Sequence, residues 1–88
     1  MSAAVKNDYV VLKITGLEGK VTRFGVKATT KMNKVKEKYA ELKGVHVNLL
    51  RFLHDGRPIQ DGDTVNSLDL FEDEICIEVY MQMLGGGQ

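Results

Sequence analysis

The chain of 88 residues contains one cysteine, Cys76, and two histidines, His46 and His54. A single cysteine cannot form an internal disulfide, and these few side chains do not make a spaced zinc cluster. The scarcity of cysteine favours a reducing, intracellular compartment. We therefore expect a fold held by its apolar core, with no metal site.

Long apolar runs are also missing. No run approaches the roughly 20 residues that a membrane-spanning helix needs. The opening segment MSAAVKNDY lacks the apolar core of a secretion signal. We expect a soluble protein of the nucleus and cytoplasm, with no membrane partner.

Catalytic motifs are equally scarce. Neither histidine has a nearby serine or cysteine in a nucleophile setting, and Cys76 alternates with the apolar residues of a strand-like segment. The glycines lie in scattered turns or in the tail, so no phosphate-binding loop is predicted. The lysines of the predicted helix lack interleaved aromatic residues, which argues against direct nucleic-acid binding. The sequence indicates a binding protein, not an enzyme, with no cofactor.

Apolar residues make up 43% of the chain, which supports one globular domain. Formal net charge is zero, but it is unevenly distributed. Residues 1–44 carry ten Lys or Arg and four acidic residues, a net charge of +6. Residues 45–88 carry two Arg and eight acidic residues, a net charge of −6. Such a split predicts two oppositely charged faces that orient partners, although the two halves could simply attract each other.

Hydrophobic spacing predicts the elements of the first half. Residues 9–15 and 21–27 alternate with period two and form a predicted hairpin. A helix is predicted to follow, with Thr30 as N-cap and Gly44 as the C-terminal stop. Its apolar face is expected to consist of Met32, Val35, Tyr39 and Leu42.

The second half shows a short strand, the turn pair Asp55-Gly56, a very short strand and a second turn at residues 61–63. Thr64 is expected to cap a brief helical turn, and a last strand, EICIEVYM, is expected to end at Tyr80. The predicted order is ββαββ(short helix)β. One main helix on a mixed sheet is an α+β roll of the β-grasp, or ubiquitin-like, type.

Four segments carry a resemblance to a known family: DYVVLKITG, FGVKATTKMNKVKEKYAELKGV, NLLRFLHDGRPIQDGDT and IEVYMQMLGG. Together they resemble SUMO, the small ubiquitin-like modifiers, over nearly the whole chain. The resemblance implies a short N-terminal arm over residues 1–8, a ubiquitin-like domain over 9–80 and a flexible C-terminal tail over 81–88.

The resemblance implies a monomer that is joined through its C-terminal glycine to lysines of target proteins. The implied partners are a SUMO protease, an ATP-dependent SUMO-activating enzyme, a SUMO-conjugating enzyme, ligases, and proteins with SUMO-interacting motifs. The modifier itself would be a substrate of those enzymes.

The tail ends LGGGQ. Alignment with the family predicts Gly85-Gly86 as the reactive end and cleavage between Gly86 and Gly87; removal of Gln88 alone is the competing choice. Glycine lets catalytic groups approach the backbone closely, because it has no Cβ. A frayed end or a cloning scar is the alternative explanation. Leu84 stands where Thr is common in the family.

Two binding surfaces are implied by the resemblance. A groove between the second strand and the helix would bind an apolar interaction peptide by adding a strand to the sheet edge. Val26, Val35 and Tyr39 could equally be core residues. Gly25 and Leu42 stand where the family has basic residues. The groove residues implied are Phe24, Val26, Lys27, Thr30, Lys34, Val35 and Tyr39.

The second implied surface is an acidic face that would meet the conjugating enzyme; solvated turn charges are the alternative. Its residues are Arg51, Asp55, Gly56, Asp73 and Glu74. In the arm, the segment VKND places an apolar residue before Lys6 and an acid two residues after it, a pattern that the conjugating enzyme reads. Lys6 is therefore a predicted acceptor for chains.

Two other protein classes share features of this sequence. A β-grasp sulfur carrier also uses a C-terminal Gly-Gly, but there the glycines must end the chain, whereas Gly87 and Gln88 follow here. A ubiquitin-like interaction domain that is never conjugated needs no glycine end at all. Trimming by a protease and loading by an activating enzyme would distinguish a modifier from both.

Overall fold

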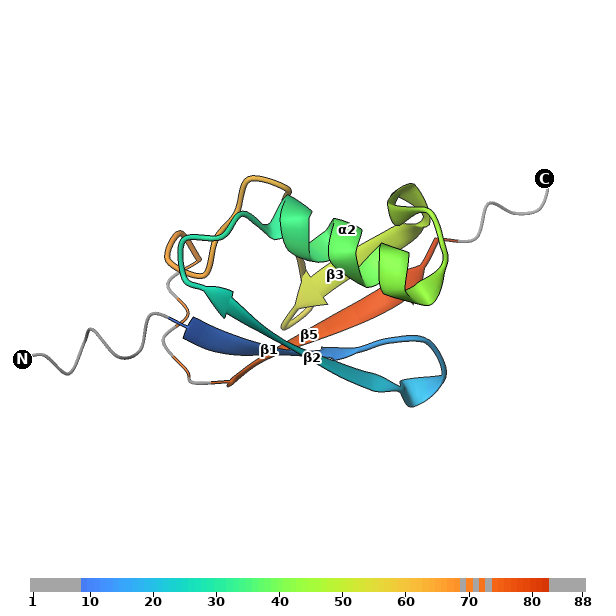
Figure 1. The fold of residues 1–88 in the computed structure, drawn as a ribbon, viewed down its shortest axis with the longest axis horizontal. Coiled ribbons are helices and arrows are strands. Elements are labelled where there is room, and N and C mark those ends of the chain that lie inside the picture. Colours follow the sequence, from blue (N-terminus) through green and yellow to red (C-terminus); the bar gives the residue numbers. More distant parts are fainter. Residues whose placement is uncertain (1–8, 69, 71, 73, 83–88) are drawn as a thin grey trace, which may run out of the picture.

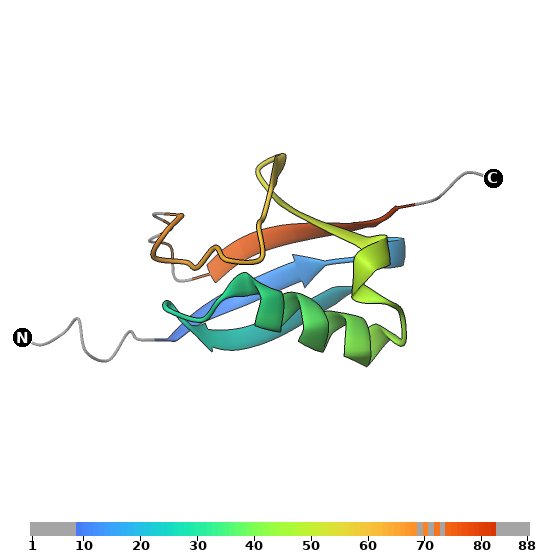
Figure 2. The same cartoon turned by 90° about the horizontal axis from the view of Figure 1, so that it is seen from above.

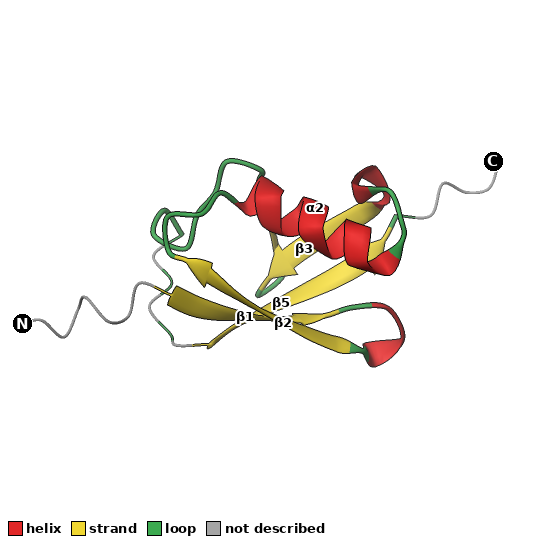
Figure 3. Cartoon of the chain, in the orientation of Figure 1, coloured by secondary structure: helices red, strands yellow, loops and turns green. Residues whose placement is uncertain are grey.

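The computed structural model describes residues 9–68, 70, 72 and 74–82. Its elements follow the order predicted from the sequence (Figure 1; Figure 3), with short 3₁₀ helices η1 and η2 in two connections. The bounds are β1 Tyr9–Thr15, η1 Leu17–Gly19, β2 Val21–Lys27, α2 Met32–Lys43, η2 Val47–Leu49, β3 Leu50–His54, β4 Arg57–Pro58 and β5 Glu74–Met81.

The strands form one five-stranded sheet in the order β2-β1-β5-β3-β4. β1 pairs antiparallel with β2 and parallel with β5, and β3 pairs antiparallel with both β5 and β4. The α2 helix crosses one face of this sheet (Figure 1; Figure 2). A mixed sheet that packs against one main helix confirms the predicted β-grasp fold.

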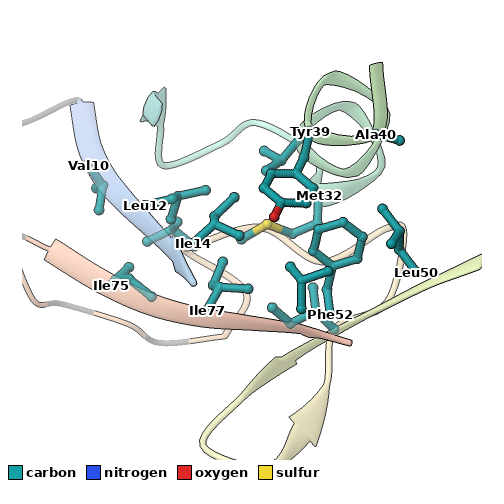
Figure 4. Close-up of a cluster of buried hydrophobic side chains, with 14 residues drawn as sticks. Val10, Leu12, Ile14, Met32, Tyr39, Ala40, Leu50, Phe52, Ile75 and Ile77 are labelled. Atoms are coloured by element: carbon teal, nitrogen blue, oxygen red, sulfur yellow. The ribbon is translucent and has the colours of Figure 1, made fainter. Parts of the chain in front are cut away.

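The core lies between α2 and the sheet. In β1 and β5 every second residue is buried, because successive side chains of a strand point to opposite faces. Tyr39 of α2 meets Phe52 of β3 edge to face, with ring centroids 5.8 Å apart (Figure 4). The buried apolar residues are Val10, Leu12, Ile14, Met32, Val35, Tyr39, Ala40, Leu50, Phe52, Ile59, Val65, Ile75, Ile77 and Val79.

The N-terminal end of α2 differs from the prediction. Thr30 is not the N-cap; that position belongs to Lys31, which makes no side-chain capping bond. The backbone N–H groups of Met32 and Asn33 instead donate to the carbonyl oxygens of Asp63 (2.8 Å) and Asp61 (3.0 Å). Because the loop satisfies these N–H groups, the helix needs no side-chain cap.

The apolar face of α2 also differs from the prediction. Met32, Val35 and Tyr39 are buried as expected, but Leu42 is 59% exposed and Ala40 is buried in its place. Leu42 lies seven residues after Val35 and so shares its side of the helix. Val35 lines the groove beside β2, and Leu42, two turns further along the helix, is exposed on that side.

The turns of the second half largely match the sequence. Asp55 and Gly56 have φ angles of 52° and 80°, as their turn requires. The short helix predicted after β4 is reduced to a single turn, in which Thr64 Oγ1 accepts from the Ser67 backbone N–H at 2.9 Å. Thr64 thus caps the turn as expected, and β5 continues one residue beyond the predicted end, to Met81.

Strand order separates the two oppositely charged halves of the sequence. The strands of the basic half, β2 and β1, form one side of the sheet, and the strands of the acidic half, β5, β3 and β4, form the other. Lys36 of α2 connects the halves, because its Nζ donates to the Ile59 carbonyl (2.6 Å) and to Asp61 Oδ1 (2.9 Å). The charge asymmetry of the sequence is therefore also an asymmetry in space.

Candidate functional site

The strand β2 has an open edge beside α2. Among the described strands, β2 pairs with β1 alone, which leaves backbone N–H and C=O groups along its other edge for an added strand. A groove of about 290 Å³ runs between this edge and the helix. It is lined by Phe24, Gly25, Val26, Thr30, Lys34, Val35 and Lys38.

Five of the seven predicted groove residues line this groove: Phe24, Val26, Thr30, Lys34 and Val35. Their positions follow from the two periodicities. Inward residues of β2 alternate along the strand, and neighbouring residues of α2 present both an apolar and a basic side chain at the rim. Apolar side chains on the floor and lysines at the rim suit an apolar peptide with acidic residues.

The other two predicted groove residues lie elsewhere. Tyr39 is 1% exposed and belongs to the core against Phe52. Lys27 alternates with the groove-facing Val26, and its Nζ lies 5.9 Å from the ring centroid of Tyr9. The structure therefore brings neither side chain into the groove.

Val26 and Val35 contribute to both the core and the groove, as the sequence allowed. Val35 is 5% exposed and is part of the buried core, yet it also lines the groove. Phe24 and Val26 are partly buried and pack against that core. The floor of the groove is thus the edge of the core, so its shape depends on the packing of the domain.

Lys38 is a groove residue that the sequence analysis missed. It lies three residues after Val35, which places both side chains on one face of α2. This helical spacing was the available signal. The backbone of Gly25 also lines the groove, in the strand position between Phe24 and Val26.

The predicted conjugating-enzyme face is spread along the sheet. Arg51 lies opposite Tyr80 near the end of β5, and Glu74 is the first residue of that strand. Tyr80 lies six positions after Glu74 along this strand, a distance of roughly 20 Å. Asp55 and Gly56 form the turn between β3 and β4, and Asp73 lies outside the described residues.

Each end of this face has a polar contact. Arg51 Nη1 donates to Gln82 Oε1 at 3.3 Å. Arg23 Nε donates to Glu74 Oε2 at 2.9 Å, and this hydrogen bond lowers the pKa of the Glu74 carboxyl below its usual range. Asp55 also lines a hollow of about 410 Å³ whose apolar walls include Ile59 and Leu68.

The predicted tail and arm residues, Gly85, Gly86, Gly87 and Lys6, lie outside the described residues. The described chain ends beside η2, where Met81 pairs with Leu50 and the Gln82 backbone N–H donates to the Leu49 carbonyl at 2.6 Å. These contacts fix the point from which the tail departs.

Within the described part of the chain, no three His, Cys, Asp or Glu side chains gather where they could hold a metal ion. No helix found there has the length and apolarity to cross a membrane.

Comparisons with known proteins place this chain in a family. The family described as Ubiquitin-2 like Rad60 SUMO-like matches residues 10–81. The small ubiquitin-related modifier of Caenorhabditis elegans is 46% identical over 79 residues, covering 90% of this chain and 86% of the relative. Small ubiquitin-related modifier 2 of Xenopus tropicalis is 40% identical over 80 residues, covering 91% and 83%.

A solved structure supports the fold independently. Caldiarchaeum subterraneum ubiquitin superposes with a TM-score of 0.77, covering 89% of this chain and 99% of that chain, at 21% identity. The fold and its open-edged groove therefore define a ubiquitin-like protein of the β-grasp class. Within that class, the chain belongs to the SUMO family and is a small ubiquitin-related modifier.

Proposed function

We propose that this protein is conjugated through Gly86 to lysines of target proteins and binds SUMO-interacting motifs in the groove between β2 and α2. The proposal rests on its membership of the SUMO family together with the Gly-Gly sequence near its C-terminus. A SUMO protease removes Gly87 and Gln88, an activating enzyme uses ATP to load Gly86, and a conjugating enzyme with ligases passes it to targets. These partners act in the nucleus and cytoplasm.

The chemistry of the tail supports this role. The terminal carboxylate has to pass through narrow clefts and then form an adenylate, a thioester and finally an amide. Glycine at the reacting end lets catalytic groups approach the carbonyl, since no Cβ stands beside it. Loading by a SUMO-activating enzyme after protease treatment is the direct test of this role.

The acidic side of the sheet is the proposed surface for the conjugating enzyme. Residues 45–88 carry a net charge of −6 and supply the strands β5, β3 and β4. A basic partner surface would be drawn to this side and oriented by it. Arg51, Asp55 and Glu74 spread this surface along the sheet, so the proposed contact is broad and not confined to one pocket.

A non-conjugated ubiquitin-like domain and a sulfur carrier are the other candidates. The groove would serve the first as well as a modifier, so noncovalent binding alone does not distinguish them. The sulfur carrier requires Gly-Gly at the end of the chain, and here two residues follow Gly86. Family membership favours the modifier over both.

Replacement of Phe24 by alanine is expected to weaken binding of an apolar interaction peptide by about 1–3 kcal/mol. The reason is that Phe24 supplies an aromatic wall of the groove. Because Phe24 also packs against the core, some loss of stability is expected as well. Isothermal titration at a temperature well below the unfolding midpoint of the variant measures the binding effect.

Val11→Ala is the matched control. Val11 is an exposed apolar residue of β1 whose side chain lies on the sheet face away from the core. This variant should bind the peptide as the unmodified protein does. Unchanged affinity in Phe24→Ala would show that the groove is not the binding site.

Replacement of Lys6 by arginine is expected to abolish or strongly slow the formation of chains in a reaction with the activating and conjugating enzymes. Arginine keeps the charge but offers no amine that can form the isopeptide bond. Conjugation of the first copy to a separate target should continue at the normal rate. Polymer formation by the variant at the rate of the unmodified protein would exclude Lys6 as the principal acceptor.

A further inference from the structure

The helix side of the groove continues beyond the pocket itself. Val35, Lys38 and Leu42 occupy positions i, i+3 and i+7 of α2, which places them on one face of the helix. Val35 and Lys38 line the groove. Leu42 follows one turn after Lys38 and is 59% exposed. The rim therefore runs from a buried apolar residue, past a cation, to a large exposed apolar residue.

The other wall of the groove is β2, which lies alongside the helix. The chain turns back between Lys27 and Met32, so β2 and α2 run in opposite directions (Figure 1; Figure 2). Leu42, near the end of the helix, accordingly lies toward the first residues of β2. A strand added to the β2 edge and continued past Phe24 would pass along Lys38 and then along Leu42.

We propose that this groove selects an extended peptide in which an apolar segment is followed along the groove by an acidic residue opposite Lys38 and, two residues further, by another apolar residue opposite Leu42. This inference rests on the proposed binding of interaction motifs in the groove. It adds to that function the pattern of side chains that the peptide carries.

Residue spacing along the helix and along an added peptide strand supports this pattern. Lys38 and Leu42 are four residues apart, which is roughly 6 Å along a helix. Residues i and i+2 of a strand point to the same face and lie roughly 6.5 Å apart. An acid and an apolar residue separated by one residue of the peptide therefore match Lys38 and Leu42.

The distribution of charge also supports it. On the strand wall, Gly25 contributes only backbone, and the Lys27 ammonium lies over the Tyr9 ring. The groove-lining cations are Lys34 and Lys38, both from the helix. An acidic residue of the peptide is therefore favoured beside Lys38. The apolar surface of Leu42 cannot pair with a second acidic residue, whereas an apolar side chain that covers Leu42 removes its surface from water.

Three synthetic peptides test the pattern. They share the apolar core Ile-Val-Ile-Val and continue with Asp-Ser-Leu, Asp-Ser-Asp or Ser-Ser-Ser. Each is also made with its extension in mirrored order before the core, so that both directions of strand pairing are sampled. In the direction that pairs, the protein is expected to bind the Asp-Ser-Leu peptide about fivefold more tightly than the Asp-Ser-Asp peptide.

Variants of the protein test whether Lys38 and Leu42 cause the preference among the peptides. Leu42→Ala should remove the advantage of Asp-Ser-Leu over Asp-Ser-Asp while leaving affinity for the Ser-Ser-Ser peptide unchanged, and Leu42→Arg should reverse the preference. Lys38→Ala should weaken both Asp-containing peptides and spare the third. Val21→Ala, which removes an exposed apolar side chain that alternates with the groove-facing residues of β2, is the matched control and should change none of these affinities.

Equal affinity for the Asp-Ser-Leu and Asp-Ser-Asp peptides would overturn the proposed pattern, as would an advantage that persists in Leu42→Ala. In either case, binding of the Ser-Ser-Ser peptide, which carries the apolar core alone, would still support the groove as a motif-binding site. Failure of every peptide to bind would instead remove the noncovalent part of the proposed function, and the pattern with it.

Discussion

A form of the protein that ends at Gly86 is expected to be loaded by a SUMO-activating enzyme and ATP without prior proteolysis. Forms that end at Gly85 or at Gly87 are expected to be loaded about 100-fold more slowly or worse, since a misplacement of even 1 Å can cost that much. An added or missing residue can move the carbonyl by as much as roughly 3.3–3.6 Å. Thioester formation on non-reducing gels, followed over time, gives the three rates.

The structure defines the reach that this prediction depends on. Gln82 is held beside η2 by its backbone hydrogen bond to Leu49, so the chain from that anchor to the proposed end consists of four residues, 83–86, with Gly86 the last of them. Fully extended, four residues span at most roughly 13–14 Å. An enzyme that grips the folded domain presents its catalytic centre at a fixed distance, and the tail has to match it.

The chain ending at Gln88 is the control for the truncated forms, and it should stay unloaded until protease is added. Loading of the Gly87 form as fast as the Gly86 form would show that the tail ends one residue later than proposed. That outcome would change the assigned terminus, whereas the role of the protein as a modifier would stand.

Replacement of Gly16 by alanine is expected to lower the free energy of unfolding by about 1–3 kcal/mol, the usual cost of overpacking a core. An added Cβ would clash with the Tyr39 hydroxyl oxygen and would lie 3.1 Å from the ring carbon that carries it. Tyr39 has little room to move, because its side chain is buried and its ring packs edge to face on Phe52 (Figure 4). Chemical denaturation measures the loss.

Tyr39→Phe supplies a specific rescue of the Gly16 variant. It removes the clashing oxygen, which is buried and has no hydrogen-bond partner among the described residues. Burial also raises the pKa of this hydroxyl, so the neutral form is favoured in the folded protein. Removing an unpaired buried hydroxyl carries little cost and can stabilise. In the Tyr39→Phe background, Gly16→Ala should therefore cost clearly less than in the unmodified protein.

Gly25→Ala is the matched control for this pair. A Cβ at Gly25 would meet no atom within 4 Å, so stability should not fall. An equal loss for Gly16→Ala in both Tyr39 backgrounds would show that contact with the hydroxyl is not the cause.

The sequence predicted most of the fold because the relevant signals are local. Alternation in β1 and β5 follows from the pleat, and the Asp55-Gly56 turn follows from its backbone angles. The start of α2 could not be predicted in this way, since its first N–H groups bond to carbonyls more than 25 residues away in the chain. A local capping rule cannot anticipate such a tertiary partner.

The candidate site was predicted in the same uneven way. Phe24, Val26 and Val35 follow from periodicity and resemblance together, and they do line the groove. Tyr39 fits the helical spacing equally well, but packing against Phe52 decides its place in the core. Leu42 also fits the helical spacing, yet it is exposed in the folded chain, so periodicity alone does not decide burial.

Conjugation through the C-terminal glycine is the central property proposed for this protein. Its most direct test is incubation of the chain ending at Gln88 with a SUMO protease, the activating and conjugating enzymes, ATP and a target protein, with the Caenorhabditis elegans relative treated in parallel. Mass spectrometry is predicted to find loss of Gly87 and Gln88 and an isopeptide bond from Gly86 to a target lysine. If the relative is loaded while this chain forms neither a thioester nor an isopeptide bond, the claim is contradicted and a non-conjugated ubiquitin-like domain is favoured.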